Sequence, residues 1–334
     1  MRSSNPLAII AIASCLVLSG CATSTQIKIL KAPELSLPRV KTVKVKEFDV
    51  TGDLQLDLIS SGGGLVGELV GAAADAGANA HASTKDSAMQ RQHLVNLKQA
   101  ILQNGFYKVT DGDDYDALIS GTGFYEVRDD GKEDSSKSDG KTTTWYEIKR
   151  KATSRLDFIV TDKSGRVLGA SEAQGVQHAS ARGDFAGEAR GRIDAWQGLV
   201  RNSLVTANEA LVKKIAPYFV TEKRTFAKGD NGAIKEANRL AKQGNWDGAV
   251  VAWTNALTGS SADKAAALHN LAIYDEVQGN VEEALAKYQE VQKLEPSSSN
   301  ATDVTRTLAR LEEIRKLKEV ETGKAPAKAP AKIN

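Results

Sequence analysis

Few residues of this sequence have the types and spacing that catalysis or metal binding requires. The cysteines are Cys15 and Cys21, and the histidines are His81, His93, His178 and His269. The histidines lack the spacing of a metal-ligating motif, and no G-x-S-x-G segment marks an activated serine. In the acidic segment 111–116, Tyr115 stands where a calcium loop needs an oxygen ligand, so a turn is expected there. We therefore expect no enzyme activity, no cofactor and no metal.

The amino-terminal segment marks Cys21 as a site of lipid attachment. One basic residue, Arg2, precedes an apolar run from Leu7 to Leu18, which has the length of a signal-peptide core and is too short to span a membrane. The run leads into Leu18-Ser19-Gly20-Cys21, which matches the bacterial lipobox. In proteins with this motif the thiol is diacylglycerylated, the leader is cut before the cysteine, and the new amino group is acylated, commonly with palmitate.

Several expectations follow from lipid attachment at Cys21. Residues 1–20 are expected to be a lipoprotein signal peptide, and residues 21–39 a lipidated tether. Ala22 follows the cysteine, and in the enterobacterial sorting pattern this favours the outer membrane, with the protein facing the periplasm. Two or three acyl chains give stable anchoring. The net charge of the sequence is +2, which does not indicate a nucleic-acid binder.

Residues 40–225 are expected to form an α+β domain. Val43, Val45 and Val50 alternate with polar residues as in a half-buried strand, and Leu94, Leu97 and Ile101 follow with helical spacing. Further strand patterns surround a polar segment, residues 129–144, which is expected to be a long mobile hairpin tip. A second amphipathic helix ends near Pro217. This order predicts a mixed or antiparallel sheet with two helices on one face.

The same residues resemble a family of envelope lipoprotein domains. The family includes the curli secretion lipoprotein, flagellar outer-membrane lipoproteins, a lipoprotein activator of penicillin-binding proteins and the amino-terminal domain of the Tol propeller protein. The positions that carry the resemblance are Phe106, Val109, Tyr115, Asp116, Ile119, Gly121, Asp162, Gly165 and Val167. The resemblance implies transport, assembly or activation without catalysis. This chain departs from the pattern by a Gly/Ala insertion at residues 60–83.

Residues 229–318 contain one helical unit twice, at an offset of 35 residues, and resemble the tetratricopeptide repeat (TPR). Gly244 aligns with Gly279, Ala249 with Ala284 and Trp253 with Tyr288, and Pro296 closes the second copy. The glycines are expected to end the first helix of each copy with positive φ. We expect an all-α domain of two repeats plus a capping helix; the alternative is a generic pair of helical hairpins.

The TPR resemblance also implies a binding groove. Arrays of this kind bind extended segments in the concave groove made by their first helices. By repeat position, the residues expected to line it are Lys235, Asn238, Lys242, His269, Asn270 and Ile273. Lysine and asparagine side chains can hydrogen-bond a carboxylate or a peptide backbone. We therefore expect an envelope protein partner in this groove, with a solvated helix face as the alternative.

Two segments of biased composition remain. The glycines Gly63, Gly67 and Gly71 are spaced by four residues, and no lysine follows them before Lys85, so a phosphate-binding loop is excluded. A mobile insertion is expected there; the alternative is a short helix that associates with another helix, another copy of the chain or the membrane surface. Residues 319–334 are rich in Lys, Pro and Ala and are expected to be disordered.

These observations together predict a non-catalytic, outer-membrane-anchored periplasmic lipoprotein. It is expected to act as an interaction scaffold or accessory factor for a machine of envelope assembly, secretion or wall synthesis. The alternative is a self-assembling, homo-oligomeric secretion pore like the curli channel. That alternative needs lipid-facing hairpins, and the segment 129–144 is too polar to face lipid.

Overall fold

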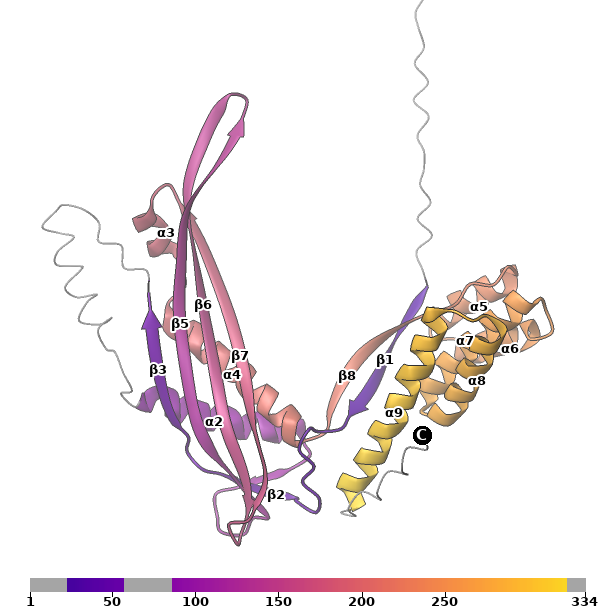
Figure 1. The fold of residues 1–334 in the computed structure, drawn as a ribbon, viewed down its shortest axis with the longest axis horizontal. Coiled ribbons are helices and arrows are strands. Elements are labelled where there is room, and N and C mark those ends of the chain that lie inside the picture. The colour runs from indigo at the N-terminus through magenta and orange to yellow at the C-terminus, as the bar shows by residue number, and fades with distance from the viewer. Residues whose placement is uncertain (1–22, 57–85, 323–334) are drawn as a thin grey trace, which may run out of the picture. The chain divides into compact units, whose positions relative to one another are not determined.

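The computed structural model describes residues 23–56 and 86–322 (Figure 1). The chain divides into two compact units. One comprises Met1–Ile29 and Thr221–Leu311, and the other Leu30–Val220 and Glu312–Asn334. We call the described residues of the first the helical unit, and residues 30–56 and 86–220 the sheet unit. Cys21, the insertion 60–83 with Gly63, Gly67 and Gly71, and residues 323–334 lie outside the described residues.

The sheet unit contains a mixed sheet, which confirms the α+β class. Its six described strands are β2 (Thr42–Val45), β3 (Asp49–Gln55), β4 (Lys108–Thr110), β5 (Ala117–Ser138), β6 (Lys141–Asp162) and β7 (Val167–Gly183). The order is β4-β2-β5-β6-β7, and β3 pairs with β5 beyond β2. Strands β2 and β3 run parallel to β5, whereas β5, β6 and β7 form an antiparallel meander.

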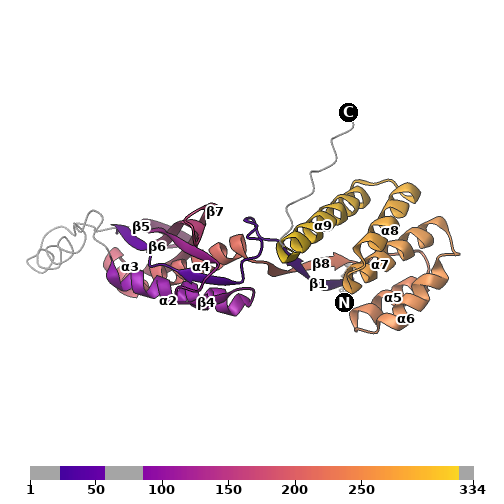
Figure 2. The same ribbon diagram turned by 90° about the horizontal axis from the view of Figure 1, so that it is seen from below.

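Two long helices cover one face of this sheet. Along β6, every second residue from Ile148 to Val160 is buried, which fixes the covered face. Helices α2 (Ser87–Asn104) and α4 (Trp196–Ile215) contribute Leu97, Ile101, Leu204 and Leu211 to the same core (Figure 2). A short helix, α3 (Ala186–Arg192), precedes α4. The opposite face carries charged residues around the exposed Phe124 and Ile159.

The segment 129–144 forms the expected hairpin tip, and its two strands stay paired up to the turn. Strands β5 and β6 continue through it in register, with Ser138 opposite Lys141, to a turn at Asp139 and Gly140. Both turn residues have positive φ, 51° and 76°, as a type I′ turn requires, and Asp-Gly is a favoured pair for that turn. At the base of this ribbon Arg150 donates two 2.7 Å hydrogen bonds to the Asp129 carboxylate. The polar segment is therefore a continuous two-stranded ribbon.

Residues 24–31 differ from expectation, because they form a strand where the sequence predicts a tether. Strand β1 (Ser24–Lys31) pairs with β8 (Tyr218–Thr225) in a two-stranded sheet. Ile27 and Ile29 of β1 are buried, while Gln26 and Lys28 are exposed. This alternation is the pattern of a half-buried strand.

The remaining described residues form the helices of the array. These are α5 (Gly232–Lys242), α6 (Trp246–Ala256), α7 (Ser261–Gln278), α8 (Val281–Leu294) and α9 (Ser298–Thr322). Gly244 and Gly279 have φ of +84° and +83° after α5 and α7, which is the left-handed conformation that ends a helix without a Cβ clash. Helix α9 runs to Thr322, so residues 319–322 of the expected tail are helical.

Candidate functional site

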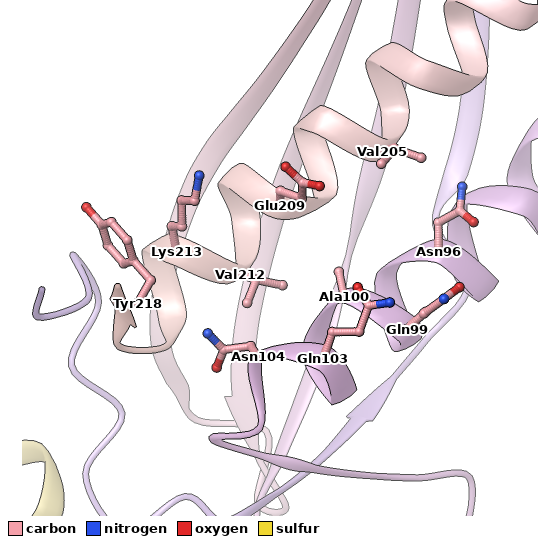
Figure 3. Close-up of a pocket in the computed structure, with 10 residues that line it drawn as sticks. All are labelled: Asn96, Gln99, Ala100, Gln103, Asn104, Val205, Glu209, Val212, Lys213 and Tyr218. Carbon is pink, nitrogen blue, oxygen red and sulfur yellow. The ribbon is translucent and has the colours of Figure 1, made fainter. Parts of the chain in front are cut away.

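The groove between α2 and α4 is the candidate binding site of the sheet unit (Figure 3). Its volume is about 430 Å³, which lies in the range of small-ligand and peptide side-chain sites. Ten residues line it: Asn96, Gln99, Ala100, Gln103, Asn104, Val205, Glu209, Val212, Lys213 and Tyr218. Five come from the second half of α2, and five from α4 or the segment that follows it.

The sequence of each helix determines which side chains reach this groove. Helix α2 buries Met89, His93, Leu97 and Ile101 at four-residue spacing against the sheet. This directs Asn96, Gln99 and Gln103 away from the core. Helix α2 starts at Asp86, whose carboxylate accepts hydrogen bonds from the backbone N–H groups of Ala88 and Met89.

Hydrogen bonds at the ends of α2 and α4 close one end of the groove. The Asn104 side chain donates to the Pro217 carbonyl at 2.9 Å. The Tyr107 hydroxyl donates to the Ile215 carbonyl at 2.7 Å, and burial raises its pKa. Gly105 ends α2 with its N–H bonded to the Ile101 carbonyl. The bonds from Asn104 and Tyr107 join the end of α2 to the end of α4.

The lining combines carboxamides, an apolar floor and one pair of opposite charges. Ala100, Val205 and Val212 form the apolar part, while Asn96, Gln99 and Gln103 offer both donors and acceptors. Glu209 and Lys213 lie one turn apart on α4, and the Lys213 Nζ is 5.9 Å from the centroid of the Tyr218 ring. Such a surface suits a neutral chain that presents both donors and acceptors and carries an aliphatic group.

Directly inside α2 lies a buried histidine. His93 is 0% exposed, and its ring centroid is 4.7 Å from that of Phe48. Among the described residues, neither ring nitrogen of His93 has a hydrogen-bond partner, nor does the Asn208 side-chain oxygen on α4. Burial lowers the pKa of His93 to about 4, and the neighbouring Asn208 carboxamide opposes this shift in part.

The groove expected in the helical unit is filled by the chain itself. Asn238 and Asn270 are buried, and both side chains donate to the Ala227 carbonyl, at 2.8 and 3.1 Å. The Ala227 N–H donates to the Asn270 side-chain oxygen at 2.7 Å. Asn238 also accepts from the Trp253 indole at 2.9 Å. The two asparagines therefore bind a peptide unit of their own chain and are not open to a partner.

The other expected groove residues do not form one surface either. Ile273 is fully buried in the core of the helical unit. Lys235 and Lys242 are exposed on α5. His269 is half-buried, and its Nε2 lies 3.1 Å from the Asp303 carboxylate. The expectation of a single open groove is thus corrected, because Phe226 and Ala227 pack on the faces of α5 and α7 that were expected to line it.

Phe226 is the apolar part of this internal contact. It is 2% exposed, and its ring centroid lies 5.5 Å from that of Trp253 and 6.2 Å from that of Trp246. The sequence contains a signal for this contact, since Phe226 is an isolated aromatic residue just before the first repeat. Repeat alignment does not detect it, because the residue lies outside the repeated unit.

A buried charge network lies on the other side of α7. Glu276 accepts hydrogen bonds from Arg224, Arg306 and the Tyr288 hydroxyl, at 2.7 to 2.9 Å. Burial and the Glu276 carboxylate raise the pKa of Tyr288. Burial would raise the pKa of Asp303, but His269 and Arg306 hold it below its usual value. Every charge in this network has an opposite partner, so removal of one partner would leave an uncompensated buried charge.

The aligned repeat residues lie in equivalent environments. Ala249, Ala284 and Trp253 are 0% exposed and Tyr288 is 1% exposed. Helix α8 ends at Leu294, two residues before Pro296. In the described part of the chain, no group of three or more His, Cys, Asp or Glu residues is placed to hold a metal ion. None of the described helices has the length and hydropathy needed to cross a bilayer.

Comparisons with known proteins give limited similarity. Residues 235–316 match a family described as a domain of unknown function, DUF6340. A search of curated proteins gives no match. Among solved structures, a minor lipoprotein from Acinetobacter baumannii has 12% identity and a TM-score of 0.23, covering 54% of this chain and 92% of its own. A PelC dodecamer from Paraburkholderia phytofirmans has 11% identity and a TM-score of 0.18, covering 58% of this chain and 99% of its own. At these TM-scores the two structures carry no argument about this chain.

Proposed function

We propose that this chain is a lipid-anchored, non-catalytic scaffold of the outer membrane, facing the periplasm, that binds an extended segment of an envelope protein between α2 and α4. The groove of about 430 Å³ in the sheet unit is the observation that carries this proposal. Cys21 is the proposed site of lipid attachment. Helices α5–α9 are proposed to be a TPR-type array, supported by the equivalent environments of Ala249 and Ala284 and of Trp253 and Tyr288.

A peptide segment is the ligand that fits the groove chemistry. Asn96, Gln99 and Gln103 can pair with the N–H and C=O groups of a peptide main chain. The same chemistry operates within this chain, where Asn238 and Asn270 hold the peptide unit at Ala227. An aliphatic side chain of the partner would pack on Val205 and Val212.

The lining also supports binding without catalysis. The described residues that line the groove include no histidine, cysteine, serine or threonine. Glu209 and Lys213 carry opposite charges one turn apart, which gives the groove no net charge from these two groups. The proposed partner segment is accordingly neutral.

Site-specific photocrosslinking in cells tests the proposal. A photoreactive amino acid at Gln103 is expected to capture one envelope protein, while the same group at Lys151 on the exposed sheet face is expected not to capture it. A peptide from the captured region should then bind the purified protein. Ala100→Phe, which fills the groove, should weaken that binding at least tenfold, and Lys151→Ala should leave it unchanged. Capture only from Lys235 on α5, or equal binding by both variants, would contradict the proposal.

A further inference from the structure

The first described residue is fixed to the core of the helical unit. The Thr23 carbonyl accepts a 2.9 Å hydrogen bond from the Phe226 N–H, and β1 starts at the next residue. The Phe226 side chain is buried between Trp246 and Trp253, and Ala227 is held by Asn238 and Asn270. Thr23 is therefore hydrogen-bonded directly to a residue of the buried core of this unit.

Only Ala22 lies between Thr23 and Cys21. A fully extended chain spans at most about 3.6 Å per residue, so the Cα atom of Cys21 lies within about 7 Å of that of Thr23 in any conformation. Acyl chains on Cys21 would hold its backbone at the level of the lipid headgroups.

We infer that the end of the helical unit around Thr23, Thr225 and Phe226 lies against the lipid headgroups, because the anchor is too short to let it leave the membrane surface. The inference rests on the proposed lipid attachment at Cys21. It replaces the expected tether of residues 21–39 by a direct contact between this unit and the bilayer.

The side chains at this surface are compatible with lipid headgroups. Within the helical unit, the exposed residues of the paired strands are Gln26, Lys28, Thr221, Lys223 and Thr225. They include two lysines, and the partly exposed Glu222 of β8 is paired with Arg224. Lysines near a bilayer are attracted to anionic headgroups. Lys28 and Lys223 therefore favour contact of this surface with anionic lipid.

Fluorescence quenching in the native, acylated protein tests this inference. Thr225→Cys places a thiol beside the Thr23–Phe226 hydrogen bond, and a bimane label on it would be measured in vesicles that contain lipid with a nitroxide on the headgroup. Strong quenching, at least threefold above that in nitroxide-free vesicles, is expected. The matched control carries the same label and about 20 Gly-Ser residues between Ala22 and Thr23, which gives a reach of about 25 Å. Quenching should fall to near background in that form.

The outcomes separate the inference from the proposed function. Mass spectrometry of the amino-terminal peptide first establishes whether Cys21 is acylated. An unmodified Cys21 would overturn the lipid anchor itself, and the inference with it. An acylated Cys21 without quenching at position 225, or equal quenching with and without the inserted linker, would overturn the inference and leave the anchor in place.

Discussion

The buried histidine of α2 makes the stability of the sheet unit depend on pH. His93 is fully buried and neutral, with a pKa lowered to about 4 from an ordinary value of 6.5. The unfolded chain binds a proton on His93 below pH 6.5, whereas the folded chain does not until about pH 4. Stability from this residue is therefore complete above pH 6.5 and is lost as the pH falls towards 4.

The magnitude follows from the two pKa values. A shift of this size corresponds to a maximum of about 3 kcal/mol, of which about 2 kcal/mol is already lost at pH 5. His93→Leu removes the titrating group and also the two ring nitrogens that lack hydrogen-bond partners among the described residues. We expect this variant to be at least as stable as the wild type at pH 8, and more stable than it at pH 5.

Urea unfolding with pulse proteolysis measures this difference, because fragments of the sheet unit are quantified separately from those of the helical unit. The wild type should lose about 2 kcal/mol more than His93→Leu between pH 8 and pH 5. The exposed His178 supplies the control, since His178→Leu should leave the pH dependence of the wild type unchanged. Parallel pH profiles for the wild type and His93→Leu would refute the assignment of a buried, neutral imidazole.

Three further predictions concern the helical unit, and urea unfolding checks each of them. Asn270→Ala removes three hydrogen bonds to Ala227 and Asn238 and should destabilise the unit by about 2 to 3 kcal/mol. Asn245→Ala, its control, removes one exposed helix cap and should cost about 1 kcal/mol. Glu276→Leu leaves the buried Arg224 and the partly buried Arg306 without their shared carboxylate and should cost about 3 kcal/mol; equal stability would show that the network does not stabilise the array. Gly244→Ala and Gly279→Ala impose a side chain on positive φ and should each cost about 1 kcal/mol, while Gly232→Ala at the start of α5 should have no such cost.

Sequence reasoning succeeded where structure depends on near neighbours. The four-residue spacing of Leu97 and Ile101 predicts α2, and the alternation around Val43 and Val45 predicts β2, because each pattern repeats within one element. Gly105 and the two repeat glycines adopt positive φ for equally local reasons. The Asp139–Gly140 turn is a local signal as well, but the polar composition of residues 129–144 concealed it.

Contacts between distant residues were not predictable in this way. Asn238 and Asn270 have the right types for binding a peptide, and the sequence does not reveal that the peptide is Ala227, which lies 11 and 43 positions away. The pairing partner of β1 is far away in the sequence, since β8 follows strands β2 to β7 and helices α2 to α4. The groove between α2 and α4 likewise depends on two helices whose polar faces meet only in the fold.

The pairing of β1 with β8 also sets the order in which the protein can fold. About 190 residues separate Lys31 from Tyr218, and at synthesis rates of about 5 to 20 residues per second β1 waits about 10 to 40 s for its partner. The six strands β2 to β7 and the helices α2 to α4 are complete before β8 exists, so they can pack together first. The helical unit is completed last, although its first strand, β1, is synthesised earliest.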